Sequence, residues 1–225
     1  MSKAGLGHHS RDMIRTLICI DRDGTLIHDE ATHLYLGRDN DWRSKVRILP
    51  HVIDSIKVLN GIPSSAVYMI TNQPGVAISD FPLLTEERAH EVCRYVVNEI
   101  KSMGSRVAGY FLCPHADRAY MEEHGEYSFD EDLVCDCDCI KPGLGMVFDA
   151  LRSEGVTREN VNVFVIGDRS TDVETALNIG GIGVLIPFEN QPDEDQKVKR
   201  LPDQSRIYIA RNLLEAAEYA SHRQH

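Results

Sequence analysis

The feature that most constrains this chain is a buried-strand pattern that ends in two acids. Residues 17–20 are four consecutive apolar residues, and Asp21 and Asp23 follow one residue apart, before the turn signal Gly24-Thr25. An apolar run without polar alternation is typical of a strand buried on both faces of a parallel sheet. Open α/β sheets bind ligands beyond the carboxyl ends of their strands, so we expect both carboxylates to face such a crevice.

Two neighbouring carboxylates repel each other, so this strand end is unfavourable unless a cation neutralises it. Carboxylates offer oxygen ligands, which suit a hard divalent ion, and we expect Mg2+. The alternative, which this segment alone leaves open, is a strand followed by a plain acidic turn. Residues elsewhere in the chain reduce the weight of that alternative.

Further along the chain, strand-like apolar runs alternate with segments of helical spacing. We expect strands over residues 16–21, 66–71, 107–112, 161–166, 183–186 and 207–210. We expect helices over residues 52–60, 85–103, 145–155, 172–179 and 213–220. We expect a loop or a small hairpin over the crevice at residues 27–47, and loops over residues 113–139 and 190–204. This alternation predicts right-handed crossovers and an α/β fold of three layers (α/β/α), with a mostly parallel central sheet.

At 225 residues the chain is long enough for one domain with a substantial core. We expect that domain over residues 14–225, preceded by a flexible polar tail over residues 1–13. The tail holds no apolar signal-peptide core, and no apolar run approaches the roughly 20 residues that span a bilayer. The net charge of -11 argues against a nucleic-acid or anionic membrane surface. We therefore expect a cytoplasmic protein without such partners, and we expect a monomer.

Polar side chains follow several of the expected strands at the point where each strand ends. Thr71 and Asn72 end the second strand, Asp168 follows the fourth, and Asp172 comes four residues later. Lys141 follows the third strand after the long loop. Because the ends of parallel strands converge on one crevice, these residues can share a site with the two acids of the first strand.

The acids of this set suit a metal ion. Asp21 and Asp168, with a backbone carbonyl near Asp23, can give Mg2+ three oxygen ligands, and water and phosphate can complete its shell. Asp172 is a supporting acid beside them. This grouping predicts a magnesium site at the carboxyl edge of the sheet.

The remaining members of the set suit a phosphate group. The ammonium group of Lys141 can supply positive charge to a phosphate oxygen. Thr71 and the backbone N–H groups around Asn72 can donate hydrogen bonds to the same phosphate. Further candidates for substrate contact, for which a packing role is equally open, are Arg22, Tyr35 and Trp42.

A carboxylate is a competent nucleophile toward phosphorus once nearby cations withdraw charge from the phosphoryl oxygens. We assign this role to Asp21. Asp23 can protonate the leaving alcohol and then take a proton from the water that cleaves the acyl phosphate. Direct attack by water, with Asp21 only a metal ligand, is an alternative that spacing alone leaves open.

The segments that carry these residues resemble, in order and spacing, the four motifs of the haloacid dehalogenase (HAD) superfamily of phosphatases. They are Asp21-Arg22-Asp23-Gly24-Thr25, Thr71-Asn72-Gln73, Lys141-Pro142 and Gly167-Asp168-Arg169-Ser170-Thr171-Asp172. The resemblance implies a Rossmann-like fold, an aspartyl-phosphate intermediate and dependence on Mg2+. The acid at Asp23 points to the phosphohydrolase branch of the superfamily.

The loop over residues 113–139 carries a second candidate metal site. Cysteines of a cytoplasmic protein are not read as disulfides, and Cys113, His115, Cys137 and Cys139 offer the ligand set of a closed tetrahedral zinc site. A structural zinc ion would order a loop of low apolar content and fix Lys141 beside it. Replacement of Cys137 by Cys135 in the ligand set, or a group of free thiols, stays open.

This Cys-x-His and Cys-x-Cys pattern before Lys141 resembles the subgroup of heptose bisphosphate phosphatases and histidinol-phosphatases, which lack a large cap domain. Two features depart from that subgroup. Ile140 stands where the subgroup usually has a substrate-contacting arginine, and the segments after Thr25 and between His115 and Cys137 are longer.

We therefore expect a Mg2+-dependent phosphomonoesterase that acts on a small phosphorylated metabolite through an aspartyl-phosphate intermediate. A sugar phosphate such as D-glycero-D-manno-heptose 1,7-bisphosphate is the first substrate hypothesis, and histidinol phosphate is the second. A zinc-stapled binding module without turnover is the alternative of another class.

Overall fold

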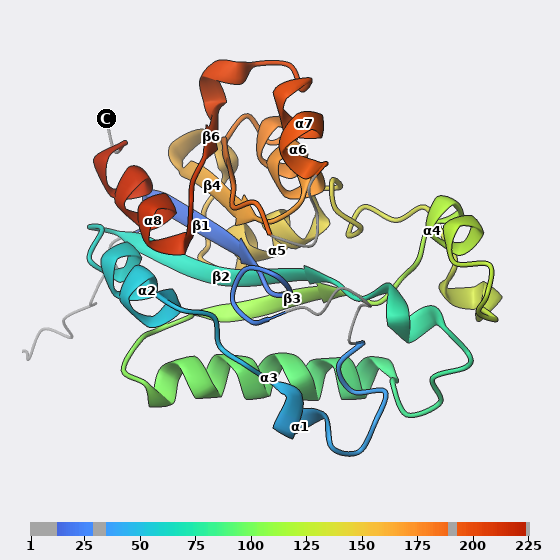
Figure 1. Ribbon diagram of the computed structural model, residues 1–225. Coiled ribbons are helices and arrows are strands. Elements are labelled where there is room, and N and C mark those ends of the chain that lie inside the picture. The colour runs from blue at the N-terminus through green and yellow to red at the C-terminus, as the bar shows by residue number, and fades with distance from the viewer. Residues whose placement is uncertain (1–12, 29–34, 189–192, 224–225) are drawn as a thin grey trace, which may run out of the picture.

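The computed structural model describes residues 13–28, 35–188 and 193–223, and its centre is one parallel sheet. The strands are β1 (Thr16–Asp21), β2 (Ser65–Asn72), β3 (Gly109–Cys113), β4 (Asn162–Gly167), β5 (Ile182–Leu185) and β6 (Ile207–Ile209). Their order across the sheet is β3-β2-β1-β4-β5-β6, and every neighbouring pair is parallel. The predicted fold class is thereby confirmed (Figure 1).

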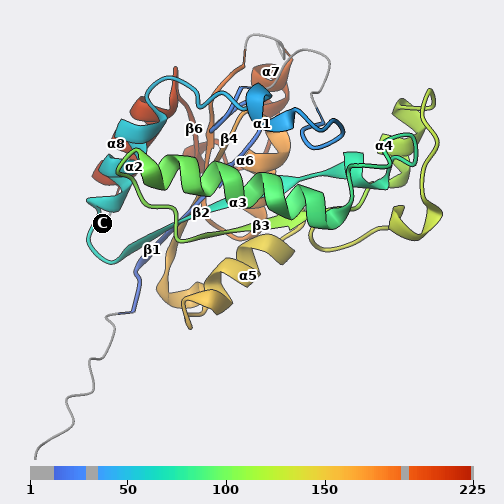
Figure 2. The same cartoon turned by 90° about the horizontal axis from the view of Figure 1, so that it is seen from below.

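Helices cover both faces of this sheet (Figures 1 and 2). The α-helices are α1 (Trp42–Lys45), α2 (Val52–Asn60), α3 (Glu86–Ser102), α4 (Arg118–Glu123), α5 (Gly145–Ser153), α6 (Ser170–Asn178), α7 (Glu194–Lys199) and α8 (Leu213–His222). Apolar residues of α2, α3 and α8 belong to one buried cluster, and those of α5 and α6 to another. The molecule is therefore a three-layer α/β/α sandwich.

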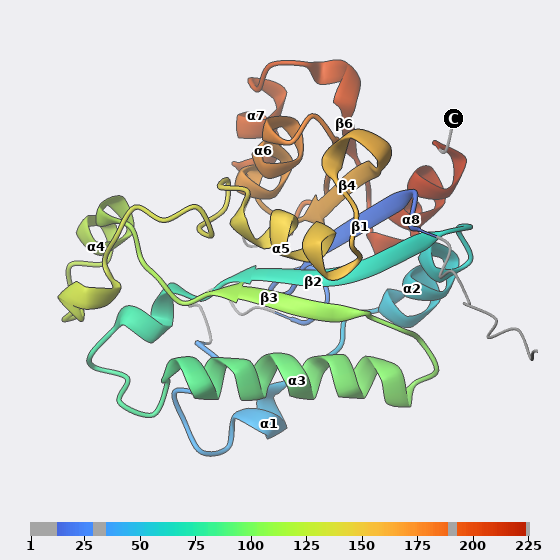
Figure 3. The same ribbon diagram turned by 180° about the vertical axis from the view of Figure 1, so that it is seen from behind.

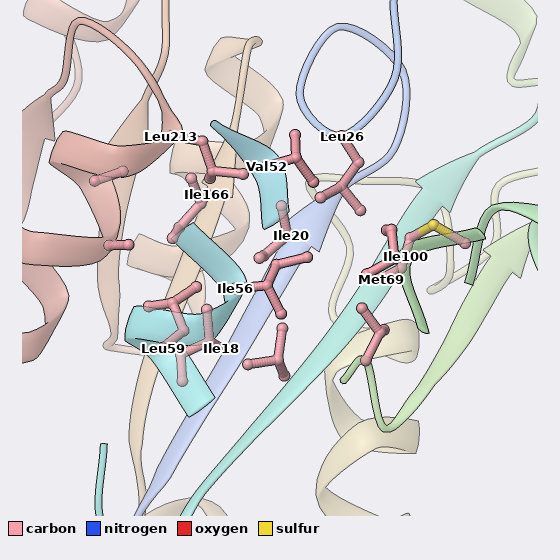
Figure 4. Packing of buried hydrophobic residues seen from close by; sticks show 14 of the residues in the cluster. Ile18, Ile20, Leu26, Val52, Ile56, Leu59, Met69, Ile100, Ile166 and Leu213 are labelled. Carbon is pink, nitrogen blue, oxygen red and sulfur yellow. The ribbon is translucent and has the colours of Figure 1, made fainter. Parts of the chain in front are cut away.

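Alternate apolar residues of a strand belong to the two different clusters. Ile18 and Ile20 of β1 pack with the layer of α2, α3 and α8 (Figure 4), whereas Leu17 and Cys19 pack with α5 and α6. All four side chains are fully buried. Successive side chains of a strand point to opposite faces, so a strand covered on both sides has no polar position. This explains why an uninterrupted apolar run predicted β1 correctly.

Two segments differ from the sequence-based expectation. The expected loop over residues 113–139 contains α4, and the expected loop over residues 190–204 contains α7, so both loop predictions were wrong in part. Asp117 caps α4 by accepting a hydrogen bond from the backbone N–H of Tyr120 (2.7 Å), although α4 buries no residue. Neither helix has the apolar stripe by which a sequence reveals a helix.

Other expectations fall partly outside the described residues. The tail expected over residues 1–13 does so except for Met13, and so do residues 29–34 of the excursion after β1. The described part of that excursion contains α1, whose Trp42 is buried against Tyr95 (ring centroids 5.4 Å apart). Trp42 therefore packs the core and does not line the pocket described below.

The direction of the chain reverses at the centre of the sheet. From β1 it proceeds to β2 and β3 on one side, and then to β4, β5 and β6 on the other. The crevice of an open α/β sheet lies at such a reversal, outside the carboxyl ends of the strands. The segment with α4 extends beyond the carboxyl ends of β2 and β3 (Figure 3).

Among the described residues, no helix is long and apolar enough to cross a membrane.

Candidate active site

A pocket of about 290 Å³ opens at the reversal point of the sheet. This volume is at the lower end of the roughly 300–1,000 Å³ of small-molecule sites. The residues predicted to handle a phosphate that line it are Asp21, Arg22, Asp23, Thr71, Asn72 and Lys141. Residues from β1, β2 and the segment before α5 thus meet in one pocket although the sequence separates them widely.

A buried ammonium group lies at the base of the site. Lys141 Nζ donates to Asp21 Oδ1 and to Asp172 Oδ1, each at 2.5 Å, and all three side chains are at most 10% exposed. Burial by itself lowers the pKa of Lys141, but the charges of Asp172 and Asp21 outweigh it and raise that pKa above its usual value. The lysine is therefore a fixed positive charge at neutral pH.

The acids around this lysine differ in the number of hydrogen-bond partners that their carboxylate oxygens have. Asp172 accepts from Lys141 and, through Oδ2, from the backbone N–H of Arg169 (3.2 Å). Asp168 is buried, and neither of its carboxylate oxygens has a hydrogen-bond partner among the described residues. A buried carboxylate without partners carries a large desolvation cost. A cation bound at this position would be the partner that the Asp168 carboxylate lacks.

The geometry around Asp168 fits a divalent cation. Carboxylate oxygens of Asp21, Asp168 and Asp172 lie within 4.8 Å of one another. Burial raises the pKa of Asp21 to about 7 against the opposing charge of Lys141. Burial and then the Asp21 charge raise the pKa of Asp168 well above its usual value. A hard cation such as Mg2+, which takes oxygen ligands, would satisfy Asp168 and keep both carboxylates ionised.

The second acid of the first motif is held by two neighbours. Arg22 donates from Nε to Asp23 Oδ1 (3.0 Å) and from Nη2 to Asp23 Oδ2 (2.8 Å). Gln73 Nε2 also donates to Asp23 Oδ2 (2.9 Å). Arg22 is only 1% exposed and also contacts Cys93 Sγ (3.5 Å). Its guanidinium therefore holds Asp23 in place, and because Arg22 also lines the pocket, its contact with substrate stays a prediction.

The amide of Gln73 links this acid to the phosphate-binding strand end. Besides Asp23, Thr71 Oγ1 (2.8 Å) and the Asn72 carbonyl (2.8 Å) lie within hydrogen-bond distance of its Nε2, whose two hydrogens are shared among these acceptors. Its Oε1 accepts from Arg22 Nη2 (2.7 Å). The Thr71 hydroxyl accepts from Gln73 and donates only a long bond (3.5 Å) to the Asn72 carbonyl, so a ligand oxygen can compete for its hydrogen. No role for Gln73 was predicted from the sequence, since its contacts join two distant segments, the turn after β1 and the end of β2.

The side chain of Asn72 fixes the backbone of Lys141. Its Oδ1 accepts from the Lys141 backbone N–H (3.0 Å), and its Nδ2 donates to the Lys141 carbonyl (3.3 Å). The strand end β2 and the segment that carries the lysine are therefore joined by a two-point contact. Asn72 thus contributes to the site by positioning Lys141.

The Cys/His residues of the long loop form a second cluster. The ligand atoms of Cys113, His115, Cys137 and Cys139 all lie within 4.8 Å of one another, and Cys135 is not part of the group. Cys113 Sγ is 2.7 Å from Cys139 Sγ and 3.6 Å from Cys137 Sγ. Three sulfur atoms and one imidazole nitrogen match a closed tetrahedral zinc site. Such an ion would join the end of β3 to the residue two before Lys141.

Several known proteins are similar to this chain in sequence or fold. A family model described as HAD-hydrolase-like matches residues 138–216. The D-glycero-beta-D-manno-heptose-1,7-bisphosphate 7-phosphatase of Rhodopseudomonas palustris is 32% identical over 182 residues, which are 81% of this chain and 87% of that protein. The chain belongs to the HAD superfamily of phosphatases.

Two further similarities are consistent with this membership. The histidine biosynthesis bifunctional protein HisB of Blochmanniella floridana is 30% identical over 168 residues, or 75% of this chain, and the chain spans about 40% of its length. The crystal structure of D,D-heptose 1,7-bisphosphate phosphatase from B. bronchiseptica, complexed with magnesium and phosphate, gives a TM-score of 0.68 at 23% identity. That match covers 92% of this HAD chain and 98% of the other, and it shows the shared fold.

Sequence reasoning missed several residues of this HAD pocket. Tyr120, Asp117 and Glu194 line it, and they belong to α4, its cap and α7, which were expected to be loop. Glu194 Oε2 accepts from the backbone N–H of Ser170 (2.5 Å) at the start of α6. A helix start favours a carboxylate because its N–H groups are unsatisfied. No local sequence signal marks this contact between two helices.

Proposed function

We propose that this protein is a Mg2+-dependent phosphomonoesterase that hydrolyses a small phosphorylated metabolite through an aspartyl phosphate on Asp21. The observation that carries the proposal is the position of Lys141 Nζ, 2.5 Å from both Asp21 and Asp172 and next to the unsatisfied Asp168. We infer that this cluster binds Mg2+ through Asp21, Asp168 and the Asp23 backbone. The Cys113, His115, Cys137 and Cys139 group would bind structural Zn2+.

Asp21 attacks phosphorus, and the leaving alcohol departs from the opposite side. Lys141 and the hydroxyl of Thr71 would hold the phosphoryl oxygens, and Asn72 keeps Lys141 in position. When bound, Mg2+ supplies charge neutralisation that lets an anionic nucleophile approach an anionic phosphate. Water then attacks phosphorus, the bond to Asp21 Oδ breaks, and inorganic phosphate leaves.

Asp23 moves the proton in both steps. It gives a proton to the leaving oxygen and then takes one from the attacking water. Arg22 and Gln73 hold both of its oxygens, which fixes the carboxylate at the mouth of the phosphate site.

The substrate we propose is a sugar phosphate of the heptose bisphosphate class. The proposal is supported by the similarity to a heptose-1,7-bisphosphate 7-phosphatase over most of both chains and by a pocket of metabolite size. Histidinol phosphate is the second candidate, because the chain is also similar to HisB proteins over part of their length. We further propose that the protein is a cytoplasmic, single-domain monomer.

Phosphate release from p-nitrophenyl phosphate with Mg2+, and with EDTA in its place, tests the reaction class. We expect turnover only with Mg2+ and none in the Asp21→Asn variant, with unchanged circular dichroism. Equal background release under all conditions would favour a zinc-stapled binding module without turnover. A panel of phosphorylated metabolites that includes heptose bisphosphate and histidinol phosphate would identify the substrate.

Phosphotransfer to added methanol separates a covalent intermediate from direct attack by water. With an aspartyl phosphate common to all substrates, the ratio of methyl phosphate to inorganic phosphate is the same for every leaving group. A ratio that changes with the leaving group would contradict the nucleophile assignment to Asp21.

A further inference from the structure

The outer wall of the pocket contains an acid that the phosphate chemistry does not use. Asp117 lines the pocket, as do Tyr35 and Tyr120. It caps α4, and the segment with α4 extends beyond the carboxyl ends of β2 and β3 (Figure 3). A leaving alcohol on the side of the phosphate opposite Asp21 extends toward this outer wall. Asp117 is therefore placed to contact the part of a substrate that differs between phosphate esters.

Asp117 differs from the other acids of the pocket in its partners. Every other acid that lines the pocket is paired with a cation, and the pairs are Asp21–Lys141, Asp23–Arg22 and Glu194–Lys197. Among the described residues, Asp117 has no such pair, and its carboxylate accepts only the backbone N–H of Tyr120, 2.7 Å from Oδ1. A carboxylate offers about four lone-pair positions on its two oxygens. Oδ2 of Asp117 is therefore an acceptor that a ligand can use.

The position of this carboxylate is fixed by the chain around it. The cap bond from Tyr120 holds Oδ1. The preceding residue, Ala116, donates its backbone N–H to the Leu133 carbonyl (3.1 Å) and accepts through its own carbonyl from the Cys135 N–H (3.0 Å). An acceptor held in this way loses little conformational freedom when a ligand binds.

We propose that Asp117 determines specificity by accepting a hydrogen bond from a hydroxyl or ammonium group of the leaving alcohol. This inference rests on the proposed phosphatase function. An ionised carboxylate only accepts hydrogen bonds, so it favours a leaving group that carries a donor. A leaving group without a donor is disfavoured, because it takes water away from the carboxylate and gives no partner in return. Ile140, which also lines the pocket, brings no charge that could replace that partner.

The Asp117→Asn variant tests the proposal without removing the helix cap. Asparagine caps helices as well as aspartate does, but its second polar atom is an amide nitrogen that donates. Asp130→Asn is the matched control, since Asp130 caps a short turn of the same loop by accepting from the Asp132 N–H (3.1 Å) and does not line the pocket. Asp117→Ser, which keeps one capping oxygen and lacks a second, repeats the test, and urea unfolding measures the stability of each variant.

The substrates compared are hexose and heptose phosphates, histidinol phosphate and p-nitrophenyl phosphate, whose leaving group has no donor. We expect Asp117→Asn to lower kcat/KM about 10- to 100-fold for the donor-bearing substrate that the wild type hydrolyses fastest, as for one lost hydrogen bond to a charged group. Hydrolysis of p-nitrophenyl phosphate, and all activities of the control variant, should stay within about twofold of wild type. A loss with sugar phosphates identifies the donor as a hydroxyl, and a loss with histidinol phosphate identifies it as the ammonium.

Three outcomes would overturn the inference. An equal loss with donor-bearing and donor-free substrates would mean that Asp117 only stabilises the pocket wall. No loss with any substrate would mean that its carboxylate does not contact the leaving group. A wild-type enzyme that hydrolyses p-nitrophenyl phosphate but no donor-bearing phosphate would overturn the inference and leave the proposed phosphatase function standing, whereas no turnover of p-nitrophenyl phosphate with Mg2+ would overturn that function itself.

Discussion

The carboxylate of Asp168 fills the space beside Gly24 that a side chain would need. A Cβ atom on Gly24 would lie 2.3 Å from Asp168 Oδ2, and Gly24 has a φ of +77°. The turn after β1 therefore requires glycine for two reasons: its backbone conformation, and the approach of the proposed metal ligand from β4. The close approach of Gly24 and Asp168 is therefore part of both the turn and the proposed metal site.

Replacement of Gly24 by alanine should consequently impair the metal site more than the fold. We expect Gly24→Ala to lower kcat at least about 10-fold and to raise the Mg2+ concentration needed for half-maximal activity, because Asp168 must move. The backbone penalty itself is about 1 kcal/mol. Gly104→Ala is the matched control, since Gly104 has a φ of +84° and nothing within 4 Å of its Cβ position. Equal effects of both variants on activity would contradict this explanation.

Gln73 should act through the acid that it holds. Gln73→Leu removes the hydrogen bonds to Asp23 and Thr71 but leaves the two bonds from Arg22 to Asp23. We expect kcat/KM to fall about 10-fold or more for alkyl phosphates and much less for p-nitrophenyl phosphate, whose leaving group needs no proton. A plot of log kcat/KM against leaving-group pKa measures the effect. An unchanged slope would argue that Gln73 is only structural.

Loss of one thiolate should release zinc and loosen the segment that carries Lys141. Cys139→Ser is expected to lose bound zinc, to lower the free energy of unfolding by about 3–5 kcal/mol and to reduce activity. Cys135→Ser is the matched control, because Cys135 lies outside the ligand group. Metal analysis by mass spectrometry and urea unfolding provide the measurements. Zinc lost from Cys135→Ser and retained by Cys139→Ser would reverse the assignment.

Glu194 should stabilise the start of α6 in a pH-dependent way. Its carboxylate accepts from the Ser170 backbone N–H (2.5 Å) and pairs with Lys197 (2.6 Å). Burial by itself raises the pKa of Glu194, but these bonds outweigh it and lower that pKa below the usual value. A pKa lowered on folding gives stability that is present above the unfolded pKa of about 4.5 and is lost as pH falls through the folded value.

Glu194→Gln should therefore cost about 1–2 kcal/mol at pH 7, and the difference from wild type should shrink below about pH 4. Urea unfolding of both proteins at several pH values measures it. Asp195→Asn is the control on the same helix, since its pair with Lys199 is exposed and such pairs contribute about 0–1 kcal/mol. A difference that is the same at every pH would mean that charge has no part in it.

The sheet and the acids at its strand ends were predictable from the sequence because both have a local cause. An apolar run such as β1 must be buried on both faces, and the acids that follow it must lie where parallel strands end. The long helix α3 was also predictable, because Thr85 caps it by accepting from the Arg88 backbone N–H. β3 begins two residues later than expected, at Gly109, although Val107 is buried.

The rest depends on contacts that join distant segments. α4 and α7 are short and lack an apolar stripe, so no periodicity marks them. The sequence left a substrate contact and a packing role equally open for Arg22, whereas the structure shows Asp23, Gln73 and Cys93 around its guanidinium. Such a cation is buried only because the carboxylate of the next residue and the Gln73 amide at the end of β2 satisfy it.

The central position of β1 also has a consequence for how the protein is made. β1 pairs with β2 on one edge and with β4 on the other, and β4 begins only at Asn162. During synthesis on the ribosome, one edge of this buried apolar strand therefore has no partner until most of the chain has been made. Unpaired edges attract other strands, so we expect the nascent chain, far more than the finished enzyme, to depend on chaperones.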